Sequence, residues 1–406
     1  MAAAEITPAA AAEAYAKSKV IDDDNLLNEI LIRISFPTTL VRAAAVCKRW
    51  LHLASGRKFL RRFRELHPPR LLGFYHNSPT SPRFVPMLPQ PPELAAVIRR
   101  SSFSLDDSQS DDAWTYIMDC RGNSVFTRRR DRSGLTLAVH NVLRPGRDMV
   151  VVPPFPRDKP QDGYLFTYSA VLSKEEGDGL SYFNLFLESS SANILVHVYA
   201  LQAGVWRAHT SASTQNRYLV SNLTALLVHN KIYIVGITRV VLVLDLTASS
   251  LSTVRLPPGV EYDSRYTVFS RAGDNSGVYL VHSNDRHELG IWLHNGDNWL
   301  LVDTIDLPAI YTYLVMSDDT LDTCVNVCIL HVADNAEFMF LEMGQWVLHL
   351  DVKSRTLRKV YEMEDERYLG RVYPFMMIWP PTFPALKDDD PARISLNLQF
   401  CGVAAT

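Results

Sequence analysis

The chain carries one pattern twice, first at Leu242-Val243-Leu244-Asp245-Leu246 with Leu251 and Val254 after it. The second copy is Leu348-His349-Leu350-Asp351-Val352 with Leu357 and Val360 after it. The shared pattern is L-x-L-D-[LV]-x4-L-x2-V, and the two copies lie 106 residues apart. Alternating apolar residues that end at a turn-forming Asp indicate β-strands. Because 106 residues exceed one small repeat unit, we expect further copies in between.

Weaker copies fill the interval and extend the pattern towards the N-terminus, which gives five anchor residues: His140, Tyr199, Asp245, His294 and Asp351. Consecutive anchors lie 46 to 59 residues apart, close to the roughly 40–50 residues of a propeller blade. A β-sandwich or two stacked sheets is the alternative, although its strand rhythm of about 8–12 residues is shorter. The sequence therefore predicts a β-propeller-like domain, with a last strand at Ile394–Phe400 that would close the ring on the first blade.

The sequence divides into four segments that differ in composition and pattern. Residues 1–20 form an Ala-rich tail that we expect to be flexible, and residues 21–67 carry helix-period patterns. Residues 68–109 are rich in proline and predict a connector with one possible strand, Leu71–Tyr75. Residues 110–406 form the strand-rich domain. The predicted fold class is an α+β multidomain protein, a small three-helix unit followed by an all-β, propeller-like domain.

The helical unit has an apolar face that is large for its size. Its first helix follows the acidic run 22–25, which suits a helix N-terminus, and Pro37 ends it. A second helix is predicted from Leu40 through Leu53, and a third from Phe59 to Leu66. A unit of about 45 residues rarely stabilises itself by burial alone. We therefore expect another protein to cover part of this face.

The helical unit resembles an F-box. Residues 26–34 resemble the first helix of that family, and residues 40–50 resemble the second, including the V-C-K-x-W signature at Val46–Trp50. Residues 59–63 resemble the segment that follows in plant F-box proteins of the grass type. Asp22 and Asp23 stand where the family usually has Leu-Pro. The downstream repeats resemble the F-box-associated β-propeller of such plant proteins.

The resemblance implies the substrate-recognition subunit of a Skp–cullin–F-box ubiquitin ligase. Its F-box would dock on a Skp-family adaptor and through it on cullin, and its propeller would recruit an unknown protein substrate. Catalysis would belong to other subunits, so the chain itself is expected not to be an enzyme. The residues expected to bind the adaptor are Leu26, Leu27, Ile30, Leu31, Ile34, Leu40, Val41, Ala44, Val46, Cys47 and Trp50. The opposite interpretation is that these side chains pack against one another.

Two other functions stay open. One is a propeller that binds a protein or ligand outside any ligase, and the other is an enzyme with its active residues in the central channel. The sequence shows no arrangement of acid, base and nucleophile, and Cys324 and Cys328 lack the further ligands of a zinc site. We therefore expect no catalytic residues, no metal and no cofactor.

Charge and cysteine content indicate which classes of partner and which cellular location to expect. The 41 Lys and Arg residues against 44 Asp and Glu residues give a net charge of −3, which argues against a globally basic nucleic-acid binder. Five scattered cysteines do not form the framework of a secreted disulfide protein. The N-terminus lacks the pattern of a signal peptide, and prolines interrupt the apolar stretch near the C-terminus. We expect no nucleic-acid or membrane partner and a cytoplasmic or nuclear location.

Overall fold

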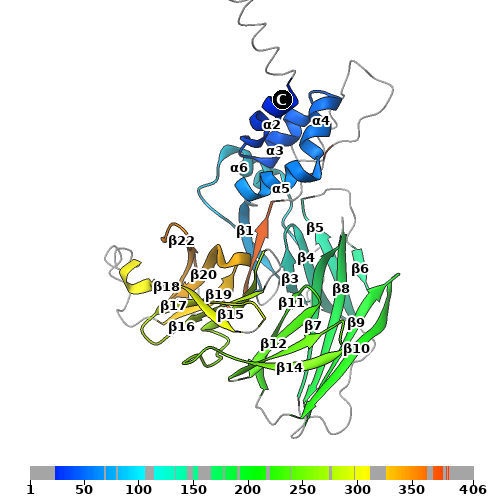
Figure 1. Cartoon of the computed structure of the whole chain (residues 1–406), viewed down its shortest axis with the longest axis vertical. Coiled ribbons are helices and arrows are strands. Elements are labelled where there is room, and N and C mark those ends of the chain that lie inside the picture. Colours follow the sequence, from blue (N-terminus) through cyan, green and yellow to red (C-terminus); the bar gives the residue numbers. More distant parts are fainter. Residues whose placement is uncertain are drawn as a thin grey trace, which may run out of the picture.

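The strand-rich part of the chain folds into separate sheets arranged around an axis, with a helical unit at one end (Figure 1). The computed structural model describes residues 23–67, 70–78, 81–105, 114–132, 134–143, 150–153, 166–176, 179–189, 193–215, 220–237, 239–273, 277–296, 298–310, 326–363, 369–377, 381 and 383. None of the helices formed by these residues is long and apolar enough to cross a membrane.

Five sheets each consist of four antiparallel strands that follow one another in the chain. The first two contain β3 (Trp114–Arg121), β4 (Ser124–Asp131), β5 (Gly134–Asn141) and β6 (Val150–Val152), then β7 (Phe166–Glu176), β8 (Gly179–Ser189), β9 (Asn193–Gln202) and β10 (Val205–Gln215). The third contains β11 (Val220–Val228), β12 (Lys231–Ile237), β13 (Val240–Asp245) and β14 (Ser250–Arg255). The last two contain β15 (Thr267–Arg271), β16 (Val278–Ser283), β17 (Glu288–His294) and β18 (Trp299–Asp306), then β19 (Val327–Val332), β20 (Phe338–Met343), β21 (Trp346–Asp351) and β22 (Thr356–Glu362). A short 3-10 turn, η1 (Asp334–Ala336), joins β19 to β20.

The five anchor residues of the sequence pattern all lie in the third strand of a sheet: β5, β9, β13, β17 and β21. The repeated Asp has a local function in two of them. The Asp245 carboxylate accepts hydrogen bonds from the backbone N–H groups of Thr247 and Ala248, both at 2.9 Å. The Asp351 carboxylate accepts one from Ser354 N–H at 2.8 Å. In these two blades the pattern therefore marks the turn into the outermost strand.

A sixth sheet closes the ring from the two ends of the strand-rich part. It contains β1 (Leu71–His76) between β2 (Arg83–Pro86) and β23 (Val372–Met376). Gly73 is required here, because a Cβ at this position would collide with the Val85 carbonyl and the Phe84 ring. The innermost strands β23, β3, β7, β11, β15 and β19 contact one another in a closed circle. The fold is thus a β-propeller, as predicted, and not a β-sandwich, and the structure shows that it has six blades.

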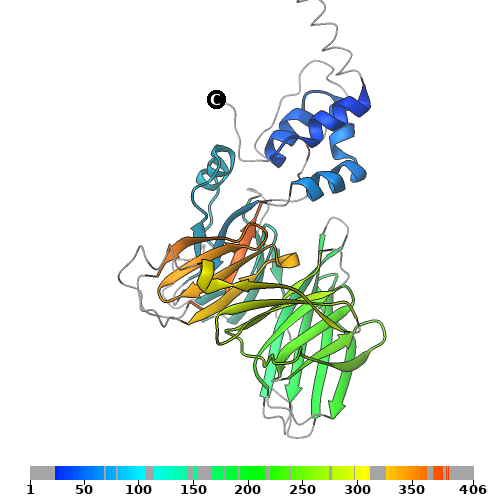
Figure 2. The same ribbon diagram turned by 60° about the vertical axis from the view of Figure 1, so that its left-hand side comes forward.

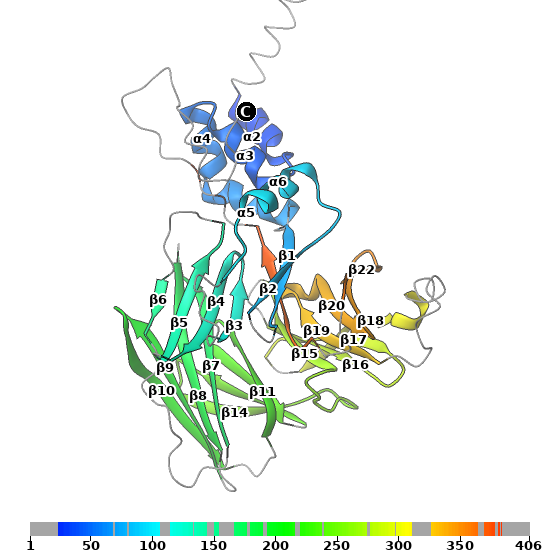
Figure 3. The ribbon, with the colours of Figure 1, turned by 180° about the vertical axis from the view of Figure 1, so that it is seen from behind.

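Apolar side chains fill the space between each pair of neighbouring blades. Six separate clusters of buried residues do so, one at each blade interface around the ring. Leu185, Leu242, Leu280 and Leu341, for example, are fully buried in this way. Burial of this extent on both faces of every blade is what stabilises the ring, and it fixes the inner strands around the central channel. In Figure 3 the blades β3–β6 and β7–β10 lie on one side of that channel and β15–β22 on the other.

The segment 68–109 differs from its predicted form. The sequence predicts a connector with one possible strand, and β1 is that strand, but β2 and the helix α6 (Pro92–Arg100) lie in the same segment. Both pack into the propeller, because Leu94 and Val97 of α6 share an apolar cluster with Tyr75. The closing strand predicted at Ile394–Phe400 lies outside the described residues, and β23 pairs with β1 instead.

The helical unit, called the head below (residues 23–67), contains α2 (Asp24–Ile32), α3 (Pro37–Ala44), α4 (Lys48–Ser55) and α5 (Arg57–Leu66). Asp23 caps α2 by accepting hydrogen bonds from two N–H groups of its first turn. The single second helix predicted from Leu40 to Leu53 is wrong. The chain is extended at Cys47, and this break lets Ala44 of α3 and Ala54 of α4 both enter the core of the head.

The head stands at the face of the propeller where β1 begins and β23 ends (Figure 2). Met377 N–H donates a hydrogen bond to the Arg70 carbonyl at 2.8 Å, which joins the end of β23 to the start of β1. The Arg70 guanidinium lies over the Phe36 ring, 5.5 Å from the ring centroid. Phe36 also packs on the apolar cluster of the propeller to which α6 contributes Leu94 and Val97. Beyond β23, Phe383 packs against the core of the head.

Candidate interaction surfaces

The helical head has both a sealed core and an open apolar surface. Leu27, Leu31, Leu40 and Ala44 are fully buried, and only 5% of Val41 is exposed. Leu27, Leu31, Leu40 and Ala44 pack with one another and with Phe63 of α5. These five side chains are therefore inaccessible at the surface of the head as it is folded here, and their contact with an adaptor stays a prediction. The interpretation that they pack against one another holds for Leu27, Leu31, Leu40 and Ala44.

Three other residues of the predicted set remain open. The exposed fraction is 46% for Leu26, 44% for Ile30 and 62% for Val46. Leu26 and Ile30 are one helical turn apart and so lie on the same face of α2, whereas Val46 lies in the turn between α3 and α4. The rest of the set, Ile34, Cys47 and Trp50, is half-buried. Large apolar side chains exposed together are unusual for a free surface.

Two ion pairs connect α2, which carries Leu26 and Ile30, to the helices beside it. The Arg49 guanidinium of α4 lies 2.6 Å from the Asp24 carboxylate, and the Arg62 guanidinium of α5 lies 2.7 Å from the Glu29 carboxylate. Both carboxylates belong to α2. Exposed ion pairs contribute little free energy, so the shared apolar core, rather than these pairs, holds α4 and α5 against the helix that carries Leu26 and Ile30.

The second candidate surface is the central channel of the propeller. It encloses about 550 Å³ and is lined by the inner strands of all six blades. Because every four-stranded blade alternates its strand direction, all inner strands start at the same face. β23 pairs antiparallel with β1, with Leu71 opposite Met376 and His76 opposite Val372. The inner strands therefore start at the face away from the head, which we call the far mouth.

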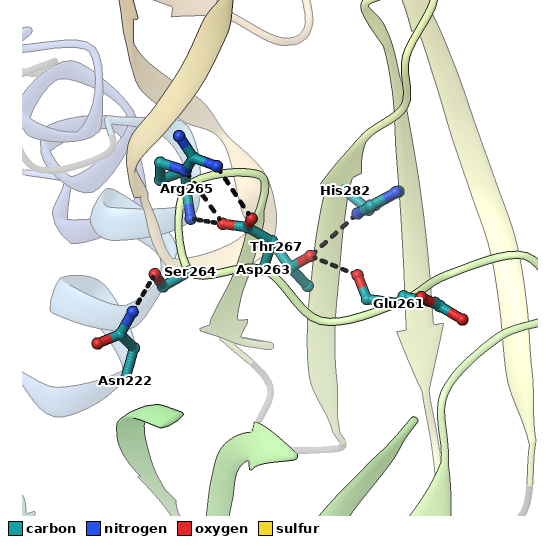
Figure 4. Close-up of polar contacts among 7 residues, drawn as sticks. All are labelled: Asn222, Glu261, Asp263, Ser264, Arg265, Thr267 and His282. Carbon is teal, nitrogen blue, oxygen red and sulfur yellow. Dashed lines mark hydrogen bonds and ion pairs between the residues drawn. The ribbon is translucent and has the colours of Figure 1, made fainter. Parts of the chain in front are cut away.

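A short loop forms part of the rim of the far mouth (Figure 4). Residues 261–266 lead into β15, and hydrogen bonds fix them at both ends. Asp263 accepts a hydrogen bond from Arg265 N–H at 2.8 Å and pairs with its guanidinium at 3.3 Å. At the other end of the loop, the Thr267 hydroxyl lies 2.9 Å from His282 Nδ1.

The same rim connects two blades through polar groups. The Tyr262 hydroxyl donates a hydrogen bond to the Asn222 carbonyl at 3.1 Å, and the Asn222 amide lies 3.4 Å from the Ser264 hydroxyl. Asn222 has a left-handed backbone, with φ at 48°, a conformation that Asn tolerates better than most residues. All three residues line the channel, so the far mouth is a preformed polar rim.

Arg371 lies at this mouth, one residue before β23, and lines the channel. Burial raises the pKa of Tyr168 to about 12, and the positive charge of Arg371 partly opposes that shift. Burial also raises the pKa values of Tyr262 and Tyr373, again opposed by Arg371. The guanidinium therefore lies within electrostatic range of tyrosines from three separate parts of the ring, all of which keep their hydroxyl protons at neutral pH.

His331 lies deeper in the channel. Loss of solvation lowers its pKa to about 3, and the charges of Arg371 and Arg271 lower it further in the same direction. Arg271 itself already has partners within the protein. Its Nε donates a hydrogen bond to the Leu227 carbonyl at 2.9 Å, and its guanidinium lies 3.8 Å from the Asp334 carboxylate. His331 is consequently neutral at physiological pH. Arg371 brings a positive charge to the far mouth, and the carboxylates Asp119 and Asp334 line the same channel.

No group of three or more His, Cys, Asp or Glu side chains suited to a metal ion occurs among the described residues. The polar residues of the far mouth have no motif in the sequence that would reveal them. Arg371, Tyr168 and Asn222 are far apart in the chain and share only their position near the start of an inner strand. Aligning the blade sequences on their inner strands, rather than on the anchor residues, would have shown that these polar residues occupy similar positions.

Comparison with known proteins places the strand-rich part in a described group. The family model described as "F-box protein AT5G49610-like, beta-propeller" matches residues 116–383. No curated protein sequence matches the chain significantly.

Solved structures give remote similarities. One belongs to a study of two prolyl endopeptidases, with 14% identity and a TM-score of 0.35 over 68% of this chain and 39% of that one. Saccharomyces cerevisiae Sqt1 has 10% identity and a TM-score of 0.33 over 64% and 65% of the two chains. The Aleuria aurantia lectin has 11% identity and a TM-score of 0.35 over 64% and 80%. The chain spans less than two thirds of the first two, and similarities this remote say nothing about what it binds.

Proposed function

Because the chain belongs to the family of F-box protein AT5G49610-like β-propellers, we propose that it is the substrate-recognition subunit of a Skp–cullin–F-box ubiquitin ligase. The head (residues 23–67) docks on a Skp-family adaptor and through it on cullin. The propeller recruits a protein substrate, and other subunits perform the ubiquitin transfer. A cytoplasmic or nuclear location is part of the same proposal.

The exposed apolar surface of the head is the observation that supports adaptor docking. The head has its own core, yet Leu26 and Ile30 still expose almost half of their side chains on one face of α2. Complete burial of one such side chain contributes roughly 1.5–3 kcal/mol. An amphipathic helix gains this free energy when its apolar face lies against another protein. We propose that the adaptor contacts Leu26, Ile30 and Val46, and also the half-buried Trp50, which packs against the core of the head.

The arrangement of the two candidate surfaces agrees with a receptor. The head joins the propeller at the face where β1 begins, and the far mouth opens on the opposite face. A protein bound at the far mouth therefore leaves the head accessible to the adaptor. Both partners can be held at once without competing for surface.

The test is co-purification of the full chain with a Skp adaptor. The double substitution Leu26→Asp with Ile30→Asp places two charges in the proposed interface, and we expect the affinity for the adaptor to fall by more than about tenfold. The matched control is Leu300→Asp with Leu301→Asp on β18, two residues that are also exposed but lie on an outer edge of the propeller. The control is expected to bind like the unaltered chain.

Two results would contradict the proposal in different ways. If the α2 double variant still binds while it stays folded, the adaptor uses another surface of the head. If the unaltered chain does not bind any Skp adaptor, the alternative is favoured, in which the propeller binds its partner outside a ligase complex. The channel with its preformed polar rim is the observation that supports this alternative.

A further inference from the structure

We propose that the far mouth of the central channel binds one anionic group, a carboxylate or a phosphate, on the protein that the propeller recruits, with the Arg371 guanidinium as its charged contact. The inference rests on the proposed function, because it gives the chemistry of the recruited substrate.

The charge of Arg371 distinguishes it from the other arginines near the channel. Within the part of the chain that the structure describes, no ion pair joins Arg371 to a carboxylate. Other arginines near the channel differ in this respect. Arg265 on the same rim pairs with Asp263, and Arg271 bonds the Leu227 carbonyl and lies 3.8 Å from Asp334. A guanidinium in a concave site without a counter-ion attracts an anion, and its planar fork suits carboxylate and phosphate.

Hydrogen-bond donors surround this charge. Tyr168 lines the channel within electrostatic range of Arg371, and its hydroxyl keeps its proton at neutral pH. The Tyr262 hydroxyl already donates its proton to the Asn222 carbonyl, so it orders the rim and is not counted as a donor to the anion. The Ser264 hydroxyl and the Asn222 amide lie on the same rim. Hydroxyl and amide donors complete the coordination of an oxyanion after the arginine has supplied the charge. The same set offers little to a cationic group, which Arg371 repels.

The dimensions of the channel indicate how the ligand enters. A volume of about 550 Å³ falls within the usual 300–1,000 Å³ of a ligand pocket and is far too small for a folded domain. An extended protein segment can insert one side chain into it while the rest of the segment lies across the rim. The ordered loop 261–266 is then a rigid part of that rim, since its hydrogen bonds exist before binding.

The first test uses small anions on the full chain. The midpoint of thermal unfolding is measured in sodium phosphate, sodium acetate and sodium chloride at equal ionic strength. Specific binding at five times its dissociation constant raises the midpoint by about 2–4 °C. Because phosphate also stabilises proteins generally, the quantity that matters is the difference between variants.

Arg371→Ala is expected to lose the anion-dependent increase, and Arg371→Lys to keep part of it. Arg265→Ala is the matched control. It removes an arginine from the same rim, but one that Asp263 already neutralises, so the increase is expected to remain. Equal increases in the unaltered chain and in Arg371→Ala would overturn the proposal, as would no increase with either anion.

The second test distinguishes the two sources of the anion. Peptides of about 12 residues with randomised flanks carry Glu, phosphoserine, Ser or Lys at the central position, and their binding to the full chain is measured. We expect the Glu or the phosphoserine series to bind about tenfold more tightly than Ser, a preference that Arg371→Ala abolishes. Preference for Glu alone indicates an acidic substrate, and preference for phosphoserine alone indicates a phosphorylated one. A preference that persists in Arg371→Ala contradicts the site.

Co-purification with the Skp adaptor is measured on the same Arg371→Ala protein and is expected to be unchanged, since the far mouth and the head lie at opposite faces. If the unaltered chain does not bind the adaptor but keeps its preference for anionic peptides, the ligase function fails and the anion site stands. If the adaptor binds and the peptides show no charge preference, the anion site fails and the ligase function stands.

Discussion

The head and the far mouth of the channel are two binding surfaces built on opposite principles. On the head, apolar side chains project from helices, and Leu26, Ile30 and Val46 are exposed because the core beneath them is already full. At the far mouth, Arg371 and the tyrosines around it lie in a depression lined by all six blades. The first surface gains free energy by removing water from apolar area, and the second by pairing a charge.

The difference has a consequence for how substitutions act. A side chain on the surface of the head can be changed without touching the propeller, whereas the residues of the far mouth sit at the start of the strands that form the ring. Substitutions at the head should therefore separate cleanly into core and interface effects. The three predictions below test how independent the two regions are.

The largest effect is expected for Leu27→Ala. Leu27 is fully buried in the head, and replacing a buried Leu by Ala leaves a cavity that costs about 3 kcal/mol or more. Leu26→Ala, at the neighbouring but exposed position, should change stability by less than about 0.5 kcal/mol. Hydrogen exchange of the amides in α2 and α3 measures both. We expect protection to fall in the head for Leu27→Ala only, with the propeller amides unaffected.

This pair separates stability from binding at adjacent residues. Leu27→Ala should lose the adaptor because the head opens, and Leu26→Ala should weaken binding while the head stays closed. Equal loss of protection in both variants would show that the head has no sealed core, and the distinction between its two kinds of apolar residue would then fail.

Acid is expected to weaken the propeller through His349. Burial lowers its pKa to about 4, and the charge of Arg358 acts in the same direction. The unfolded chain, with an ordinary value of about 6.5, binds the proton more readily. The stability that His349 contributes is therefore present above about pH 6.5 and is lost as the pH falls towards 4, with about 2 kcal/mol lost between pH 7 and pH 5. Urea denaturation at the two pH values measures this.

His349→Phe isolates the contribution of this one histidine. The ring is only 6% exposed, stacks on Phe338 with centroids 5.2 Å apart and leaves its Nδ1 atom without a hydrogen bond. A phenyl ring should therefore fit the site at neutral pH, and the variant should lose less stability than the unaltered chain on acidification. An identical pH dependence in both proteins would mean that other groups of the propeller carry the effect.

The sequence predicts the ring better than it predicts the site. The anchors Asp245 and Asp351 are local features, because the turn that each carboxylate caps lies within three residues of it. Local features repeat with the blades, and so five blades are visible in the sequence. The sixth blade is not visible in the sequence, because its strands β1 and β23 are about 300 residues apart in the chain. Only their pairing in the folded structure brings them together.

In the head, periodicity identifies the apolar residues but not their depth. Leu26 and Leu27 are adjacent in the sequence and equally apolar, yet one is half-exposed and the other fully buried. Which of them turns inward depends on where α4 and α5 pack, and that depends on the break at Cys47. The far mouth is harder still, since Arg371 and Tyr168 meet only when the ring closes.

The smallest effect, and the one that bears most directly on the independence of the two regions, is expected for Phe383→Ala. Phe383 comes after the last blade, yet its half-buried ring packs against the core of the head. A buried Phe contributes about 3–5 kcal/mol over Ala, so a half-buried one at the edge of a cluster should contribute about 1 kcal/mol. We expect the head amides to exchange about fivefold faster, while Leu66→Ala, at an exposed position on α5, changes nothing. If Phe383→Ala has no effect, the head is complete within residues 23–67 and the propeller only carries it. If the effect is as expected, the end of the propeller chain helps to hold the head in position, and the orientation of the adaptor relative to the far mouth is fixed by a contact that lies in neither surface.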